Sequence, residues 1–245
     1  AAGASAGAGW LVAAIAWPVI ALLLVIAGGE RLAARVGVLA LPIGLAIAAA
    51  VALGVAGSGE LVYHVGGWAP PLGIALRADG LSAAMLLVTA VVAGGAGIYA
   101  LADFGPPRTG ASGRTTLAFW ASLLGAWAAL NLAFLGNDLF NLYVALELLT
   151  FAAVPLVCLD GRAETLKAAL RYLLYALVGS VLYLLGAVLL YGAYGTLDIV
   201  LLAERVRPVP SVIAAAAPDR RRRRPGRGQL LCSHHRPEPH MGAAE

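Results

Sequence analysis

One carboxylate interrupts a long apolar stretch of the sequence. Glu147 lies inside "NDLFNLYVALELLTFAAVPLVCL", which runs from Asn137 to Leu159. If this stretch is a helix, Tyr143, Glu147 and Thr150 occupy positions i, i+4 and i+7, so the acid shares one face with two hydroxyl groups. Such a carboxyl group can take up and release a proton, because burial favours its neutral form and a nearby cation favours its charged form.

The placement of Glu147 favours a functional role. On insertion scales an acid at the centre of a membrane helix costs about 3 kcal/mol, and such residues usually face a bundle interior or a water-filled path. We therefore expect proton transfer by Glu147. The alternative is a structural acid, which is kept neutral by a hydrogen bond or is paired with a cation to hold two helices together.

Two basic residues one helical turn apart, Lys167 and Arg171, are further candidates for an ion path. Arg171 lies deeper in its apolar segment than Lys167. Both residues also have an ordinary explanation, because long basic side chains at a membrane boundary reach out to the lipid headgroups. Lys167 can in addition pair with Glu164 on the same helix.

A few uncharged polar residues can surround Glu147. Asn131, Ser180 and Tyr183 are predicted either to complete a hydrated interior or to make packing contacts, which in membranes favour small and hydroxylated side chains. Asp79 and Asp138 stand where helices should begin, so we expect both to be helix caps.

The elements that must position these residues are membrane spans. The chain of 245 residues is 61% hydrophobic and 12% charged, against roughly 45–50% and about 25% in an ordinary soluble domain. Apolar runs of about 20 residues, the length that crosses a bilayer, recur along the chain. They lack the alternation of barrel strands, so we predict an all-α polytopic membrane protein. Six spans are expected, near residues 10–27, 36–56, 81–101, 117–135, 139–159 and 170–191.

The loops between the spans predict an orientation. Arg77 is the only Lys or Arg residue in the loops after the second and fourth spans. The loops after the first, third and fifth spans hold more basic residues, so by the positive-inside rule they face the cytoplasm. The N-terminal segment, residues 1–9, then lies on the outer side. We expect the membrane to be the inner membrane of a prokaryotic cell. The basic residues of these other loops are Arg31, Arg35, Arg108, Arg114, Arg162, Lys167 and Arg171.

The connection over residues 57–80 differs from the other loops. Its runs "ELVYHV" and "GIALRA" favour strands and flank the turn sequence "GGWAPP", so we predict an external β-hairpin. After the sixth span, "GTLDIVLLAERVRP" predicts a short interfacial helix capped by Thr196 or Asp198. The membrane domain is thus expected to cover residues 10–207.

The hydrophobic pattern breaks in residues 208–245. "SVIAAAA" begins an apolar run that stops at Pro218, and a tail rich in Arg, Pro and His follows. Three interpretations stay open: a disordered tail, a patch that binds anionic lipid or nucleic acid, and a frameshift. We favour the frameshift, because the change falls inside a span that has begun. Seven of the 17 Lys and Arg residues lie in this tail, so a nucleic-acid partner for the chain as a whole is not expected.

No cofactor or metal site is expected. The sequence contains no phosphate-binding glycine loop, nucleophile elbow, cysteine cluster or haem-attachment motif. His234, His235 and His240 lack the regular spacing of zinc ligands. The chain therefore shows no redox chemistry of its own.

Three stretches together resemble a known family. They are "GGWAPPLGIALRADGLSAAMLLVTAVV", "FLGNDLFNLYVALELLTFAAVPLV" and "ALRYLLYALVGSVLYLLGAVLLYGAYGTLDI". In this order they are similar to the proton-conducting, antiporter-like membrane subunits of respiratory complex I (NADH-quinone oxidoreductase), multisubunit sodium/proton antiporters and membrane-bound hydrogenases. The resemblance covers about residues 36–199. It implies a larger bundle built from inverted repeats, of which this sequence holds an incomplete, N-terminal part.

The resemblance also implies roles for single residues. Glu147 matches a glutamate that in the family is coupled to a lysine two spans later, and Arg171 matches a basic position at the start of the sixth span. That lysine should follow soon after "SVIAAAA", where this sequence has none. Lys167 can replace it only by turning inward from the membrane boundary.

These observations predict a membrane subunit of a proton-translocating complex that resembles NADH-quinone oxidoreductase, with electron transfer in other subunits. The expected partners are other membrane subunits, the lipid bilayer and protons, with Na⁺ as a further candidate ion. The chain alone is predicted to be truncated and inactive. Two alternatives stay open: a subunit of a multisubunit cation/proton antiporter without electron transfer, and a non-transporting membrane scaffold.

Overall fold

The computed structural model describes residues 3–68, 73–103 and 113–206. The chain divides into one compact unit, Ala1–Val206, and a second unit, Arg207–Glu245. The tail predicted over residues 208–245 and the basic residue Arg108 of the expected cytoplasmic loops lie outside the described residues.

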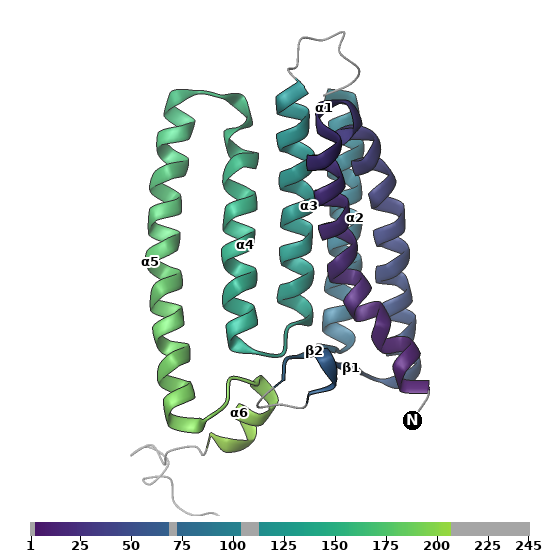
Figure 1. Ribbon diagram of the computed structural model, residues 1–245, viewed down its shortest axis with the longest axis vertical. Coiled ribbons are helices and arrows are strands. Elements are labelled where there is room, and N and C mark those ends of the chain that lie inside the picture. Colours follow the sequence, from purple (N-terminus) through teal and green to yellow (C-terminus); the bar gives the residue numbers. More distant parts are fainter. Residues whose placement is uncertain (1–2, 69–72, 104–112, 207–245) are drawn as a thin grey trace, which may run out of the picture. The chain divides into compact units, whose positions relative to one another are not determined.

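Long helices make up most of the first unit (Figure 1). The described residues contain five helices that are long and apolar enough to cross a membrane. This architecture confirms the all-α polytopic membrane fold. The helices are α1 (Gly3–Ser58), α2 (Gly80–Asp103), α3 (Gly113–Leu135), α4 (Leu139–Val157) and α5 (Ala163–Tyr194).

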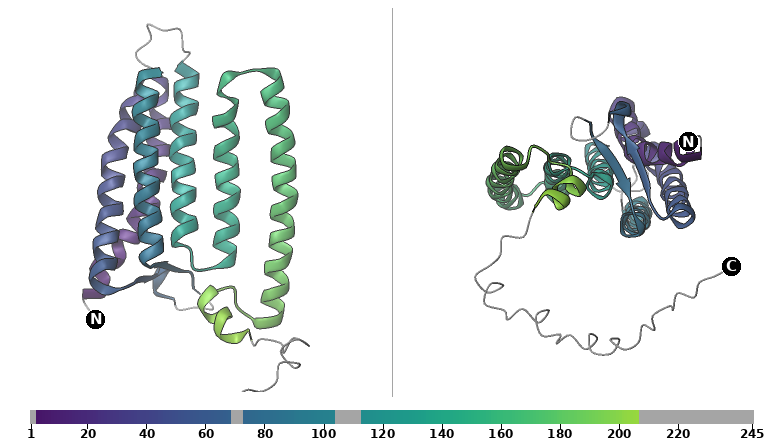
Figure 2. Two further views of the ribbon diagram at one scale, coloured as in Figure 1. Left: turned by 180° about the vertical axis from the view of Figure 1, so that it is seen from behind. Right: turned by 90° about the horizontal axis from the view of Figure 1, so that it is seen from below.

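The first two predicted spans fall within a single element, α1. Its backbone breaks at Gly29, where φ is 63° and ψ is −162°, a conformation that a glycine adopts without a steric penalty. The chain reverses there, and the two halves of α1 run side by side (Figures 1 and 2). The Trp17 indole N–H on one half donates a hydrogen bond of 2.9 Å to the Ala40 carbonyl on the other. The six expected segments therefore appear as five helices.

The other helices differ from the predicted spans at their ends. α5 begins at Ala163 rather than near residue 170, and α4 ends at Val157 in a 3₁₀ turn, η2 (Cys158–Asp160). The reason is that hydropathy marks only the lipid-crossing part of a helix, whereas polar residues such as Glu164 and Lys167 extend the same helix beyond it. Gly195 follows the last residue of α5, and its φ of 68° is the left-handed conformation common after a helix end.

The core of the bundle lies between α1, α2 and α3. Trp120 and Trp127 of α3 are almost fully buried against glycines of α1, and a Cβ atom added at Gly37 or Gly44 would overlap their indole rings. Small residues allow such close helix approach in membranes. α4 packs on α3, and α5 packs on α4, so the bundle continues as a row of helices on one side (Figure 2).

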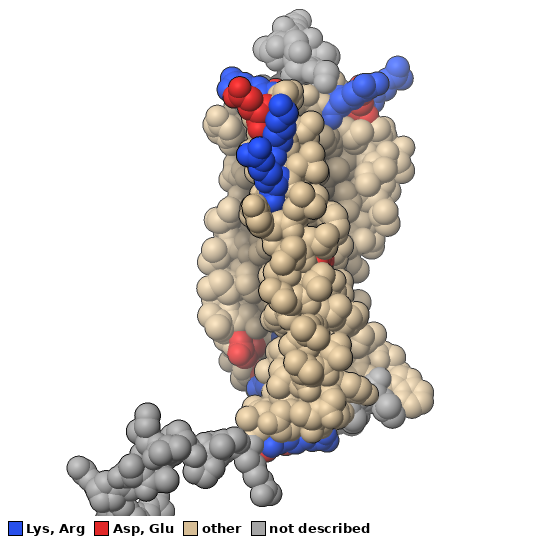
Figure 3. Space-filling view, turned by 90° about the vertical axis from the view of Figure 1, so that its left-hand side faces the viewer, with Lys and Arg blue, Asp and Glu red and all other residues tan. Residues whose placement is uncertain are grey.

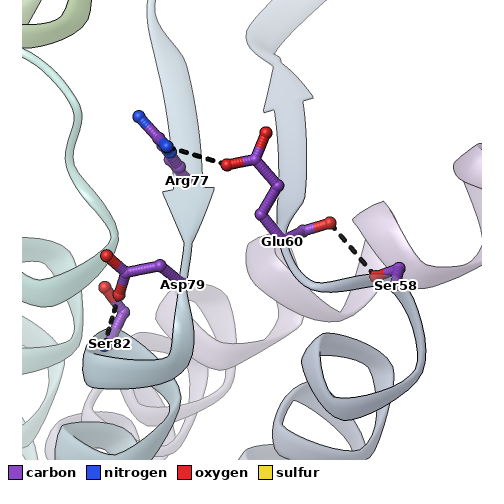
Figure 4. A network of polar contacts seen from close by, with 5 residues as sticks. All are labelled: Ser58, Glu60, Arg77, Asp79 and Ser82. Carbon is purple, nitrogen blue, oxygen red and sulfur yellow. Dashed lines mark hydrogen bonds and ion pairs between the residues drawn. The ribbon is translucent and has the colours of Figure 1, made fainter.

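The predicted β-hairpin is present at one end of the bundle. Strand β1 (Leu61–His64) pairs antiparallel with β2 (Ala75–Ala78). The carboxylate of Glu60, directly before β1, forms an ion pair of 2.7 Å with Arg77 of β2 (Figure 4). Asp79 accepts a hydrogen bond of 2.8 Å from the Ser82 backbone N–H and thus caps the start of α2, as the sequence predicted.

The turn between α3 and α4 connects the hairpin to the segment after α5. Gly136 pairs with Leu76 of β2, and Asp138 pairs with Asp198. The Asn137 side chain also donates a hydrogen bond of 2.8 Å to the Asp198 carboxylate. These contacts join three stretches that are far apart in the sequence at the hairpin end of the bundle.

Two predicted caps lie in this region. The carboxylate of Asp138 accepts hydrogen bonds from backbone N–H groups in the first turn of α4. The predicted short helix is α6 (Ile199–Arg205), and Asp198 caps it by accepting a hydrogen bond of 3.0 Å from the Leu201 N–H. Asp198 rather than Thr196 is therefore the capping residue.

Candidate proton-transfer site

Glu147 lies near the middle of α4 and faces α5. At about 1.5 Å per residue it is about 12 Å from the first residue of α4 and about 15 Å from the last. Its carboxyl group forms a hydrogen bond with the hydroxyl group of Ser180, which lies near the middle of α5. The side chain of Glu147 is half-buried. The bond thus joins a carboxyl and a hydroxyl group of two neighbouring helices at mid-depth.

An aromatic layer follows one helical turn away, towards the hairpin end. Tyr143 on α4 stacks on Tyr183 of α5, with ring centroids 6.4 Å apart and an angle of 14° between the planes. The Tyr183 hydroxyl donates a hydrogen bond of 3.2 Å to the Leu139 carbonyl. Ser180 and Tyr183 are therefore the α5 partners of the face that carries Glu147 and Tyr143.

Thr150 stands on the same side of α4 but does not bind across to α5. Its hydroxyl donates a hydrogen bond of 2.9 Å to the Leu146 carbonyl one turn earlier in α4. Such a bond within the helix satisfies the hydroxyl group locally. The structure gives Thr150 no contact with the Glu147 carboxyl among the hydrogen bonds of the described residues.

Asn131 lies on α3 and faces α1 instead of Glu147. Its side chain is 4% exposed, and its amide nitrogen donates a hydrogen bond of 2.7 Å to the Ala14 carbonyl. Its amide oxygen is buried and has no hydrogen-bond partner within the described part of the chain. The structure therefore does not bring Asn131 together with Glu147, Ser180 and Tyr143.

Lys167 and Arg171 are exposed and lie close to the opposite end of the bundle from the hairpin. Ser180, which marks the level of Glu147, is about 20 Å along the helix axis from Lys167 and about 14 Å from Arg171. In the part of the chain that the structure describes, neither residue forms an ion pair. Figure 3, which looks onto α5, shows Lys and Arg gathered at that end, further charged atoms near the other end, and little charge between the two.

A cavity of about 380 Å³ lies at the level of these basic residues. It lies between α4 and α5, and its lining includes Thr165 of α5. The other lining residues are Ala153, Val154, Val157, Ala168, Ala169 and Tyr172. Apart from the hydroxyl groups of Thr165 and Tyr172, the walls are apolar, so they offer no charged group to the carboxyl of Glu147.

Sequence reasoning identified most of these residues but not their partners. The spacing along α4 predicted that Tyr143 and Glu147 share one face, and in the structure both side chains contact α5. The sequence did not reveal the contact between Asn137 and Asp198, because the two residues are 61 positions apart and no local pattern links them. Among the described residues, no group of three or more His, Cys, Asp and Glu side chains is arranged to hold a metal ion.

Comparisons with known proteins match this chain to one family of membrane proteins. Residues 136–216 match the model of the NADH:quinone oxidoreductase/Mrp antiporter transmembrane family. This range contains Glu147, Ser180 and Tyr183. It ends before the Arg-rich stretch that starts at Arg220.

Two curated relatives are similar over about half of the chain. A subunit of the Na⁺/H⁺ antiporter of Bacillus subtilis is 30% identical over 131 residues, which are 54% of this chain and 25% of the relative. A subunit of the NADH-quinone oxidoreductase of Desulforudis audaxviator is 39% identical over 122 residues, 49% of this chain and 24% of the relative. The match thus spans about a quarter of the length of these relatives.

Two solved structures share the fold. The membrane-bound sulfane sulfur reductase, an archaeal respiratory membrane complex, contains a chain with a TM-score of 0.67 and 28% identity, covering 80% of this chain and 40% of that one. The Mrp complex of Dietzia gives a TM-score of 0.67 and 27% identity, covering 78% of this chain and 35% of that one. By sequence and by fold, the chain is therefore similar to the antiporter-like membrane subunits of such complexes, over part of the length of its relatives.

Proposed function

We propose that the chain is part of a membrane subunit of a cation/proton-translocating complex, and that Glu147 takes up and releases the transported proton. The relatives that match the chain include an antiporter subunit and a quinone oxidoreductase subunit. The observation that carries the proposal is the hydrogen bond between Glu147 and Ser180. It places a protonatable group at mid-depth of a membrane helix, next to a hydroxyl group on its neighbour.

The cost of ionising Glu147 makes it suited to this role. A carboxylate at mid-depth is expensive unless a cation or water is near, so a change in the nearby charge changes the occupancy of the proton. Within the described residues, no Lys or Arg forms an ion pair with Glu147. In this proposal the cation that drives proton release comes from another segment or another subunit, and Lys167 and Arg171 act at the membrane boundary.

The proposed setting is the inner membrane of a prokaryotic cell, with the N-terminus and the hairpin outside. Arg31, Arg35, Arg114 and Arg162 lie at or near the end of the bundle opposite the hairpin, which fits a cytoplasmic location of that end. Electron transfer, in a complex that carries it out, is assigned to other subunits. Protons are the proposed ion, and Na⁺ is the alternative.

Glu147→Gln in the assembled complex tests the proposal. The amide keeps the size of the side chain but cannot release a proton, so proton uptake by inverted membrane vesicles of the native host should fall to background. Glu164→Gln is the matched control, because Glu164 is an exposed residue in the first turn of α5. Flux per assembled complex that is the same for Glu147→Gln and the wild type would contradict the proposal.

The same vesicles separate the alternatives. If Glu147→Gln lowers the amount of assembled complex and leaves flux per complex unchanged, Glu147 is structural and the chain is a scaffold. Proton movement that requires Na⁺ and no electron donor would indicate an antiporter, and movement that requires a donor would indicate respiratory coupling. The purified 245-residue chain in sealed vesicles should carry no protons, because no described cation is placed to drive release from Glu147.

A further inference from the structure

The hydroxyl group of Ser180 lies between two hydrogen-bond acceptors. One contact is with the carboxyl oxygen of Glu147. The other, at 3.0 Å, is with the carbonyl oxygen of Leu177, one turn earlier in α5. A serine hydroxyl has one hydrogen to donate and two lone pairs that accept. Ser180 therefore cannot donate to both oxygens at the same time.

The protonation state of Glu147 decides whether both contacts can be hydrogen bonds. An ionised carboxylate only accepts, so Ser180 must choose between Glu147 and the Leu177 carbonyl. A protonated Glu147 donates its own O–H to the Ser180 oxygen, and Ser180 then donates its hydrogen to Leu177. Both contacts are satisfied together only when Glu147 carries a proton.

We propose that Ser180 is a positioning residue that holds Glu147 in its protonated form between transfer events. When the proton leaves, the Ser180 hydroxyl turns from the Leu177 carbonyl to the carboxylate and becomes its donor. Leu177 lies within α5, so its carbonyl still accepts the ordinary bond of the helix. The turn therefore exchanges one side-chain bond and leaves the helix intact.

The charges around Glu147 agree with a protonated resting state. The elements in contact with α4 are chiefly α3, α5 and η2. In their described residues, the only charged side chain on α3 is Arg114, and those on α5 lie in its first third. The titratable groups on these elements and on α4 are Arg114, Tyr143, Cys158, Asp160, Glu164, Lys167, Arg171, Tyr172, Tyr175, Tyr183, Tyr191 and Tyr194. The nearest of them to Glu147 on the shared face are the neutral tyrosines Tyr143 and Tyr183.

Infrared difference spectroscopy of the purified chain in lipid nanodiscs tests the hydrogen bond directly. The carboxylic C=O band of Glu147 is identified by its loss in Glu147→Gln. At neutral pH the band should be present in the wild type. In Ser180→Ala it should shift to higher wavenumber, because the protonated carboxyl loses its partner, and Ser180→Thr should restore it because threonine keeps the hydroxyl. Ser122→Ala removes a buried hydroxyl from α3 and should leave the band in place.

The proposal would be overturned if no protonated band is present at neutral pH, or if Ser180→Ala leaves the band unshifted. A shift of the same size in Ser122→Ala would also overturn it. If Ser180→Ala does not fold, Ser180→Cys provides the test, because the sulfur of a thiol is a weaker acceptor than a hydroxyl oxygen and should give a smaller shift in the same direction.

The consequence for transport rests on the proposed function. In vesicles with the assembled complex, Ser180→Ala should lower proton flux and displace its pH profile, and Ser180→Thr should restore both. The two proposals fail separately. An unshifted infrared band together with flux that depends on Glu147 would reject only the role of Ser180, whereas a shifted band with flux independent of Glu147 would reject only the proposed function.

Discussion

The amide nitrogen of Asn131 donates its hydrogen bond to the Ala14 carbonyl, the carbonyl that Pro18 leaves without a partner in α1. In a helix the N–H of residue 18 would bond to the carbonyl of residue 14, but proline has no N–H. Pro18 lies inside α1 and is fully buried. A side chain 117 positions away therefore satisfies the acceptor that the proline exposes in the bundle interior.

Asn131→Ala should destabilise the bundle by about 1 kcal/mol, the range of hydrogen bonds between membrane helices. The measurement is thermal or denaturant unfolding in detergent, followed by tryptophan fluorescence. In Pro18→Ala the helix recovers the missing N–H, so the same Asn131→Ala change should cost less in that background. Equal costs in the two backgrounds would show that the bond to Ala14 does not depend on the proline.

Gly44→Ala should destabilise the packing of α1 on α3, because the added methyl group overlaps the Trp127 ring. Overpacking of this kind costs about 1–3 kcal/mol. Gly94→Ala on α2 is the matched control, since a methyl group there meets nothing within 4 Å. Replacing a helix glycine by alanine stabilises the helix by up to about 1 kcal/mol. The two variants should thus change the melting temperature in opposite directions, and a common direction would contradict this account of the interface.

The cap at Asp79 should weaken in acid. The backbone N–H of Ser82 is the main cause that lowers the pKa of the Asp79 carboxyl below 3.8, and Arg77 adds to the effect. Because the folded pKa is lowered, the stabilisation is complete above the unfolded pKa and is lost as the pH falls through the folded pKa. Hydrogen exchange of the first turn of α2 should therefore accelerate below pH 3.8 in the wild type relative to Asp79→Asn. Identical pH profiles for the two proteins would exclude the cap as the cause.

The orientation of the bundle can be tested by labelling single cysteines in intact cells. In a chain with Cys158→Ser and Cys232→Ser, Val65→Cys lies in the hairpin and Ala163→Cys lies at the start of α5. A membrane-impermeant maleimide should label Val65→Cys and should reach Ala163→Cys only after the cells are permeabilised, as the positive-inside rule requires. The reverse pattern would place the N-terminus in the cytoplasm.

Local features of this chain were predictable from its sequence. The length of the apolar runs indicated the helices, because a lipid-crossing segment must satisfy its own backbone groups. The i, i+4 spacing placed Tyr143 and Glu147 on one face, and the caps at Asp79 and Asp138 follow from their places before apolar runs. The helix ends were less well predicted, since α5 starts before its apolar part.

The tertiary structure decided which of these faces meet. The contacts of Ser180 with Glu147, Asn131 with Ala14 and Asn137 with Asp198 join residues that are 33, 117 and 61 positions apart. No period of a helix or a strand relates such positions, because each contact depends on how whole helices pack and on which turns bring their ends together. Sequence periodicity therefore determined the elements and the face that carries the acid, and packing alone placed the hydroxyl group of one serine between that acid and a backbone carbonyl of the next helix.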